Sequence, residues 1–181
     1  MNANFIVFCG EIMSIYRTEK NGHILLRVSD GHEHVGFFIA DEKIKEEFCY
    51  AVGERICLCG NIQSHSSSAD GKRHPPTIFV TSISKSDYTD GFNKFYVSGK
   101  IVRVTFRDDA CTVVLQTKEK HISFVPITFF FMNEEVRSLA PGMIIATAGK
   151  VQICRRKKAV GEGYKYRQIY RGYSNTLKKI G

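Results

Sequence analysis

The chain repeats itself at a fixed offset of 89 residues, and this repeat limits its fold more than any other feature. The recurring residues are Asn4, Gly10, Ile12, Leu26, His32, Glu46, Ala51, Gly53, Gly60 and Gln63, matched without a gap by Asn93, Gly99, Ile101, Leu115, His121, Glu135, Ala140, Gly142, Gly149 and Gln152. The glycine pairs are the most informative, because glycine is kept where a backbone bends or approaches another group closely. Each copy has about 90 residues, enough to bury a workable core. We therefore predict two copies of one small domain.

Charge is divided unevenly between the two copies, which we place at 1–88 and 89–181. Residues 1–90 hold nine Lys/Arg and twelve Asp/Glu, a net charge of −3, whereas residues 91–181 hold seventeen and six, a net charge of +11. Basic residues that only kept the protein soluble would be spread more evenly. The positive electrostatic field of the second copy favours a polyanionic partner for that copy. The acidic first copy is left open to self-association or protein contacts.

The cysteines predict neither a metal site nor a cofactor. Cys9, Cys49, Cys57, Cys59, Cys111 and Cys154 include no C-x-x-C pair and no histidine at zinc-finger spacing. We expect buried free thiols in a reducing compartment. The start of the chain carries no positively charged leader, and its apolar run is too short to span a membrane. A cytoplasmic protein with no membrane partner is expected.

Hydrophobic alternation and turn signals divide each copy into five strands and one short helix. The expected strands of the first copy are Phe5–Arg17, His23–Ser29, Val35–Ala40, Arg55–Ile62 and Thr77–Ser84; those of the second are a strand through Val97 and Val104, then Cys111–Thr117, Ile122–Phe129, Ile144–Ile153 and Tyr166–Tyr173. The expected helices are Asp41–Tyr50, with Asp41 as its cap, and Asn133–Leu139. A change of hydrophobic phase near Gly10, repeated between Ile101 and Val102, predicts a β-bulge in the first strand of each copy.

Five strands with one helix between the third and the fourth is the element order of the OB-fold. This fold is a small closed barrel whose face and loops bind oligonucleotides or oligosaccharides. We therefore predict an all-β chain of two tandem five-stranded OB-fold barrels, each with one short helix between strands three and four. The pattern by itself leaves the ligand open.

Three short motifs give the chain a resemblance to the single-stranded DNA-binding proteins of bacteria and phages. Each copy opens with Asn, an apolar run and Gly, at Asn4–Gly10 and Asn93–Gly99, as members of that family do. Each has a fourth strand between two glycines seven apart, followed by an apolar and a polar residue, at Gly53–Gln63 and Gly142–Gln152. The segment Asp70–Arg73, ahead of a β-rich stretch, looks like the family's loop before its last strand. The resemblance covers nearly the whole chain.

The resemblance implies a protein that coats or protects exposed single strands of DNA in replication, recombination or repair, with little sequence preference. Similar proteins assemble four barrels, so it also implies a homodimer of this two-barrel chain. Two departures stand out: the chain has no tryptophan to stack on bases, and it ends Thr176–Gly181 without an acidic tail that recruits partners. One alternative is an OB-fold interaction module of a replication, primosome or conjugation assembly. Another is a single-stranded RNA binder.

A basic segment of the second copy is the main candidate for nucleic-acid contact. Non-specific single-strand binding needs cations along the phosphates and flat rings on which bases stack. Both kinds of residue are interleaved in Arg155, Arg156, Lys157, Lys158, Tyr164, Lys165, Tyr166, Arg167, Tyr170 and Arg171. Gly161 and Gly163 indicate a mobile tip, so we predict a finger between strands four and five that closes over a strand. The alternative is a solvated basic hairpin whose tyrosines support the barrel.

Two further groups in the second copy extend this candidate surface. Arg103 and Arg107 continue the basic track on the first strand. Phe106 lies beside them, although its phase with the apolar residues before it favours burial. Three consecutive phenylalanines, 129–131, end the third strand and cannot all point into one core, because successive strand residues face opposite sides. Phe130 is the expected exposed ring, and a subunit interface would explain its exposure equally well.

The first copy holds a weaker candidate. Lys72 and Arg73 lie in its corresponding loop without interleaved aromatic residues, and its acids would repel phosphates over much of the surface. The sequence contains no phosphate-binding loop, nucleophile elbow or zinc-protease motif. We therefore expect no catalytic residues and no enzymatic activity.

Overall fold

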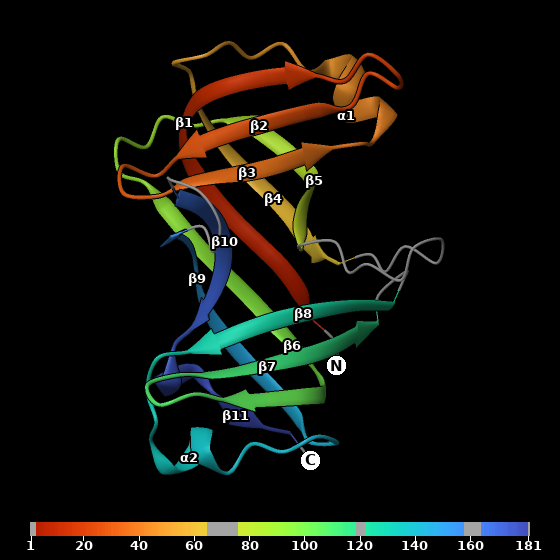
Figure 1. The fold of residues 1–181 in the computed structure, drawn as a ribbon. Helices are drawn as coiled ribbons and strands as arrows, with labels where there is room; N and C mark the ends of the chain where they lie inside the picture. Colours follow the sequence, from red (N-terminus) through yellow and green to blue (C-terminus); the bar gives the residue numbers. More distant parts are fainter. Residues whose placement is uncertain (1–2, 65–75, 119–121, 158–163, 181) are drawn as a thin grey trace.

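The all-β, two-copy prediction is confirmed by the computed structural model, which describes residues 3–64, 76–118, 122–157 and 164–180 (Figure 1). The strands are β1 (Asn4–Arg17), β2 (Ile24–Ser29), β3 (His34–Ile39), β4 (Arg55–Gln63), β5 (Thr77–Lys85), β6 (Phe92–Phe106), β7 (Cys111–Lys118), β8 (Ile122–Phe129), β9 (Ile144–Lys157), β10 (Tyr164–Gly172) and β11 (Lys178–Lys179). The helical segments are α1 (Glu42–Glu47), α2 (Glu134–Arg137) and the 3-10 turn η1 (Ser174–Thr176). As predicted, α1 lies between the third and fourth strands of the first copy, and α2 holds the same place in the second.

Each set of five strands closes into a barrel. β1, β2 and β3 form an antiparallel meander, β5 lies parallel to β3, and β4 pairs with both β5 and β1. β6 to β10 repeat this order. The long strands β1 and β6 close the barrels, because their middle parts pair with β4 or β9 and their last parts with β2 or β7. The register shifts between Ile12 and Ser14 and between Ile101 and Arg103, so the predicted bulge is confirmed in both copies.

Strand alternation fills the two barrels with apolar side chains. Three apolar side chains of β1, Ile6, Phe8 and Ile12, and their repeat equivalents in β6, Phe95, Val97 and Ile101, are fully buried. Full burial of such side chains contributes about 1.5–3 kcal/mol each. The buried residues of both barrels belong to one cluster, so the core continues from one barrel to the other.

The two barrels are joined by a pseudo-symmetric pairing of β1 with β6. Asn4 lies opposite Val97, and Phe8 lies opposite Asn93. Ile6 lies opposite its own repeat equivalent, Phe95. Since the repeat offset relates Asn4 to Asn93 and Phe8 to Val97, a local two-fold axis passes between Ile6 and Phe95. The eleven-stranded sheet is therefore a pair of barrels related by symmetry within one chain.

The recurring asparagines each join the first strand of a barrel to the fourth strand of the same barrel. Asn4 Nδ2 donates to the carbonyl oxygen of Ile62 at 2.7 Å, and Asn4 Oδ1 accepts from the Ile62 N–H at 3.1 Å. Asn93 makes the same two bonds with Val151, at 2.8 and 2.9 Å. Ile62 and Val151 are repeat equivalents and are fully buried. The backbone pairing of β1 with β4 ends at Gly60, and that of β6 with β9 ends at Gly149. Each asparagine therefore bonds the N–H and C=O groups of a buried residue that lies beyond this pairing, which explains why it recurs.

Two of the recurring glycine pairs have steric reasons. Gly53 and Gly142 have φ angles of 89° and 96°, in the left-handed region that favours glycine, at the turns that lead into β4 and β9. A Cβ atom on Gly60 or Gly149 would overlap the main chain of the neighbouring strand. The repeat thus preserves glycine where a side chain would strain or separate the strands.

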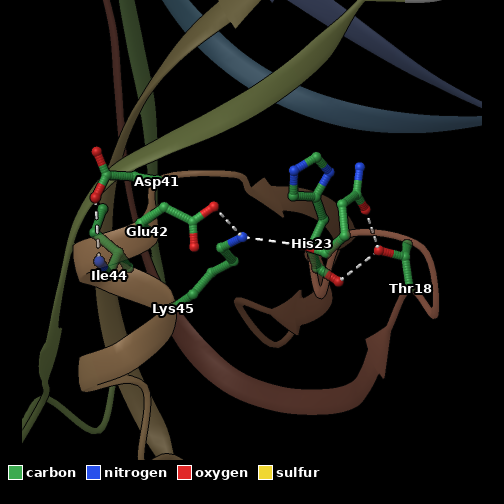
Figure 2. A network of polar contacts seen from close by, with 7 residues as sticks. Thr18, His23, Asp41, Glu42, Ile44 and Lys45 are labelled. Atoms are coloured by element: carbon green, nitrogen blue, oxygen red, sulfur yellow. Dashed lines mark hydrogen bonds and ion pairs between the residues drawn. The ribbon is translucent and has the colours of Figure 1, made fainter.

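Helix α1 is tied to the β1–β2 turn by a buried lysine. Asp41 caps the helix, as predicted, because its side chain accepts the Ile44 N–H at 3.1 Å. Lys45 Nζ donates to Glu42 Oε1 at 2.8 Å and to the Asn21 carbonyl oxygen at 3.0 Å (Figure 2). A buried ammonium group requires such partners. The contact therefore holds the turn against the helix.

Both helices are shorter than predicted. α1 ends at Glu47 because Phe48 turns to extended backbone and buries its ring in the core. α2 is a single turn, capped by Asn133, whose side chain accepts the Val136 N–H at 3.0 Å. No helix in the described ranges is long and apolar enough to span a bilayer.

The expectation of buried free thiols is wrong for most of the cysteines. Cys9 and Cys57 lie opposite each other on β1 and β4 and form a disulfide. The other four are free and differ in exposure: Cys49 and Cys59 are exposed, Cys154 is half-buried and Cys111 is buried. Among the residues that the structure describes, no three metal-binding side chains are grouped so that they could hold a metal ion.

Candidate nucleic-acid interface

The outer face of β6, β7 and β8 carries exposed cations beside apolar and aromatic surface. Arg103 on β6 lies opposite Val114 on β7. Lys100 on β6 lies opposite Gln116 on β7, and Gln116 lies opposite Phe124 on β8. Arg103, Lys100 and Phe124 are all exposed. Arg103 was predicted from the sequence, whereas Lys100 and Phe124 were missed, although the alternation of β8 places Phe124 outward.

The basic segment predicted from the sequence lies in the β9–β10 hairpin. β9 pairs with β6 up to Gly149. Beyond that residue it pairs with β10 alone, as far as Lys157. In the backbone register, Tyr166 lies opposite Arg155, Lys165 opposite Arg156 and Tyr164 opposite Lys157. The described part of the segment belongs to the two strands themselves, not to a loop between them as predicted, and its contact with nucleic acid remains a prediction. Lys158 and the glycines of the predicted tip lie outside the described residues, as do Lys72 and Arg73 of the first copy.

Arg171 stacks on two phenylalanine rings at the end of β8. Its guanidinium carbon lies 5.2 Å from the ring centre of Phe130 and 5.8 Å from that of Phe131. The two rings are 37% and 46% exposed, so Phe130 is exposed as predicted. Phe131 is exposed as well, because β8 ends at Phe129 and strand alternation ends with it. Arg171 Nε is buried and has no hydrogen-bond partner in the described part of the chain.

Two predicted contact residues have an environment that the sequence did not indicate. Tyr170 is 1% exposed and packs edge-to-face on Phe95, and its hydroxyl accepts a bond from Gln168 Nε2 at 3.1 Å. The prediction that Tyr170 contacts nucleic acid is therefore wrong; burial raises the pKa of its phenol and keeps it neutral. Phe106 is 48% exposed despite a phase that favoured burial, because it ends β6 next to the turn that holds the exposed Arg107.

Three exposed arginines of the second barrel lie outside the ion pairs of the described residues. The three ion pairs among the described residues all lie in the first barrel: Lys43–Glu47, Lys45–Glu42 and Lys85–Glu54. Arg103, Arg107 and Arg167 are exposed and take part in none of them. Guanidinium groups form strong, often bidentate bonds with phosphates. The charge of the second copy is thus presented on its surface.

A cleft of about 370 Å³ lies where the first barrel meets β10. Gln168 Oε1 accepts the Gly36 N–H at 3.1 Å and holds β10 against β3. Phe38, on the cleft wall, packs edge-to-face against His23 and Phe79, with ring centres 5.0 and 5.1 Å apart. This aromatic surface was not predicted, because the candidate residues of the first copy lie in the loop before the fifth strand, which contains no aromatic residue. The outward phase of Phe38 in β3 is the signal that could have revealed it.

The barrel closure and the joined sheets place the chain among tandem OB-fold proteins. No protein-family model matches it, and no curated protein is significantly similar to it. The wild-type single-stranded DNA-binding protein from Thermus aquaticus has a similar structure, with a TM-score of 0.69 at 12% sequence identity over 99% of this chain and 94% of that one. A deletion mutant of the same protein gives 0.68 at 12% identity, over 99% and 95%. The likeness covers both barrels, so the predicted tandem OB-fold is confirmed.

Proposed function

We propose that this protein binds single-stranded DNA with little sequence preference and coats or protects exposed strands in replication, recombination or repair. The observation that carries the proposal is the outer surface of the second barrel, where exposed cations lie outside the ion pairs of the described residues and the half-buried Arg171 stacks on exposed phenylalanine rings. Phosphates bind cations along any sequence, and every base offers a flat face to a ring. The likeness in fold to a protein named for single-stranded DNA binding supports the same class of ligand.

The two copies have different parts in this proposal. Residues 89–181, with a net charge of +10, form the main nucleic-acid-binding barrel. Within it the β9–β10 hairpin, Arg103, Arg107 and Arg171 supply cations, while Phe106, Phe130 and Phe131 supply rings. Residues 1–88 form the acidic barrel, which contributes to self-association or protein contacts.

We also propose that two chains associate as a homodimer with four barrels, through the sheet face at the local two-fold axis. Phe5 is 42% exposed there, and its ring stacks on Tyr96 with centres 4.9 Å apart. Ile6 and Phe8 point into the core, so Phe5 lies on the opposite face. Sedimentation equilibrium should give twice the chain mass of 20.5 kDa, and Phe5→Glu should give the single chain. A monomeric wild-type protein would refute this assembly.

The function is tested by fluorescence titration of labelled oligo-dT and oligo-U at low and moderate salt. The hairpin variant changes Arg155, Arg156 and Lys157 to alanine; the matched control changes Lys20, Lys43 and Lys85, all exposed in the first barrel. We expect dT binding that weakens as salt is added, at least tenfold weaker binding by the hairpin variant, and little change in the control. Tighter binding of oligo-U would assign the protein to RNA. Absence of binding at low salt would refute the proposal and favour a protein-interaction module.

A further inference from the structure

We propose that Lys94, Lys150 and Arg171 form a binding site for a phosphate group on the outer face of β6, β9 and β10. The part of β6 concerned pairs with β1 and β9, whereas the face described above lies on the part that pairs with β7. The site is defined by phosphate chemistry, and the phosphate belongs either to a free anion or to a DNA strand. The site itself therefore does not depend on the proposed single-strand binding.

The strand register places the three cations side by side on neighbouring strands. Lys150 lies opposite Arg171 in the β9–β10 ladder. Gly149, the residue before Lys150, lies opposite Phe95, the residue after Lys94. The bonds of the second recurring asparagine hold β6 and β9 together one step further along, so Lys94 and Lys150 are neighbours. Adjacent strands are about 4.8 Å apart, and an anion above Lys150 therefore has a further cation on each side.

All three cationic side chains point away from the core. Each has a neighbour in its strand that is buried in the core: Phe95, Val151 and Tyr170 respectively. Successive strand residues face opposite sides of a sheet, so the cations lie on the outer face. They are half-buried there, which keeps their charges close to the sheet.

No acidic side chain of these strands offsets the charge of the row. β6, β9 and β10 contain no Asp or Glu, and the three cations take part in none of the ion pairs of the described residues. Asp30 accepts a bond from Asn93 Nδ2 at 3.0 Å, but Asn93 shares the face of Phe95, opposite to that of Lys94. Like charges that face each other on neighbouring strands are destabilising, so a bound anion stabilises the row.

The fold does not require these cations. The repeat equivalents of Lys94 and Lys150 are Phe5 and Asn61, which are uncharged. The first barrel nevertheless closes through the same strand pairings. The cation row therefore belongs to the second copy alone and calls for an explanation other than barrel closure.

Aromatic rings hold two of the cations in place. Lys94 Nζ lies 5.2 Å from the ring centre of Tyr96, and Arg171 stacks on Phe130 and Phe131. A guanidinium group binds phosphate through two parallel bonds, and an ammonium group acts on it as a point charge. A phosphate monoester carries about −1.5 to −2 charges at pH 7, so three fixed cations match it better than they match one carboxylate.

The site borders the proposed contact between two chains. The Tyr96 ring beside Lys94 also stacks on Phe5. Association through this face removes the cations partly from water, which is costly for charges without a counter-ion. A bound phosphate offsets this cost, a role that rests on the proposed homodimer.

The test is an NMR titration of the full chain with inorganic phosphate, in which amide shifts show where the anion binds. We expect saturable shifts centred on Lys94, Lys150 and Arg171. Lys94→Gln with Lys150→Gln, the site variant, should bind phosphate about tenfold more weakly. The matched control, Lys178→Gln with Lys179→Gln, removes two exposed charges from β11 of the same barrel and should bind like wild type. Shifts that are absent or not localised, or equal binding by the site variant, would overturn the inference.

A charge-preserving variant guards against a change of fold in the site variant. Lys94→Arg with Lys150→Arg should bind phosphate within about twofold of wild type, because both charges remain. Loss of binding in this variant together with a native circular dichroism spectrum would overturn a site built on these charges.

Oligo-dT separates the two sources of phosphate. If the strand supplies it, the site variant binds oligo-dT more weakly, and the slope of log Kobs against log salt concentration becomes shallower by about 1.4 for two contacts. Unchanged oligo-dT binding by the site variant, with its inorganic phosphate binding lost, assigns the site to a free anion. Failure of wild type to bind oligo-dT would overturn the proposed function, while the phosphate titration still decides the site.

Sedimentation equilibrium in phosphate and in chloride at equal ionic strength tests the role in assembly. Wild type should associate more tightly in phosphate, and the site variant should associate equally in both salts. Equal association of wild type in both salts would overturn this role.

Discussion

Replacement of Asn93 by alanine tests the role of the recurring asparagines in pairing the first and fourth strands of each barrel. The substitution removes the donor 2.8 Å from the Val151 carbonyl oxygen and the acceptor 2.9 Å from its N–H. Val151 is fully buried, so both main-chain groups lose their partner without replacement. Each such group costs about 1–3 kcal/mol, which predicts a loss of about 2–6 kcal/mol in the free energy of unfolding. The bond from Asn93 to Asp30, at 3.0 Å, is partly exposed and adds little.

Urea unfolding followed by circular dichroism measures this loss as a lower midpoint at an unchanged m-value. The melting temperature of a chain of this size changes by roughly 2–4 °C per kcal/mol, so it should fall by about 4 °C at least. Asn4→Ala should be destabilising to a similar extent, because Asn4 makes the equivalent bonds to Ile62. Asn175→Ala, at an exposed position, should stay within about 0.5 kcal/mol of wild type. A loss below about 1 kcal/mol for Asn93→Ala would refute the reasoning.

Three further predictions concern the packing of the barrels. Gly149→Ala should destabilise the fold by about 2–3 kcal/mol in urea, because its Cβ would overlap the β10 main chain, and an unchanged midpoint would contradict this. Tyr170→Phe should cost about 1 kcal/mol at pH 8, from the hydroxyl bonds. Because burial raises the phenol pKa, the stability due to Tyr170 is fully present below its unfolded pKa of about 10 and is lost as pH rises beyond it; equal pH profiles for wild type and Tyr170→Phe would argue against this. Burial also raises the pKa of the Cys111 thiol, so Ellman's reagent should label Cys49 and Cys59 in the native protein and Cys111 only after unfolding, whereas rapid native labelling of Cys111 would show an open core.

Much of the fold could be predicted because the repeat and the strand alternation are local properties of the sequence. Recurring glycines and asparagines marked positions that the backbone geometry requires, and the Ile122–Phe129 strand has the bounds expected from its pattern. Strand ends were harder to place. Phe106 and Phe131 lie where the ladder stops, and alternation no longer decides which way a ring faces.

Features that depend on contacts distant in sequence could not be predicted. The Gly36–Gln168 bond joins residues 132 positions apart, so no local pattern indicates that β10 borders a cleft of the first barrel. Tyr170 lies among basic residues in the sequence, yet its ring completes the core because β10 pairs with β8 at that position. The disulfide between Cys9 and Cys57 follows from the β1–β4 register, which spacing alone does not give.

The most direct test of the central claim is the salt dependence of oligo-dT affinity for the intact protein. Each neutralised phosphate of a single strand contributes about −0.7 to the slope of log Kobs against log salt concentration. Contacts from Arg103, Arg107, Arg167 and Arg171 alone would give a slope of about −3, and the basic hairpin should make it steeper. A slope of about −3 or steeper is therefore expected. A slope between zero and about −1, or no binding at low salt, would contradict single-strand binding through the second barrel.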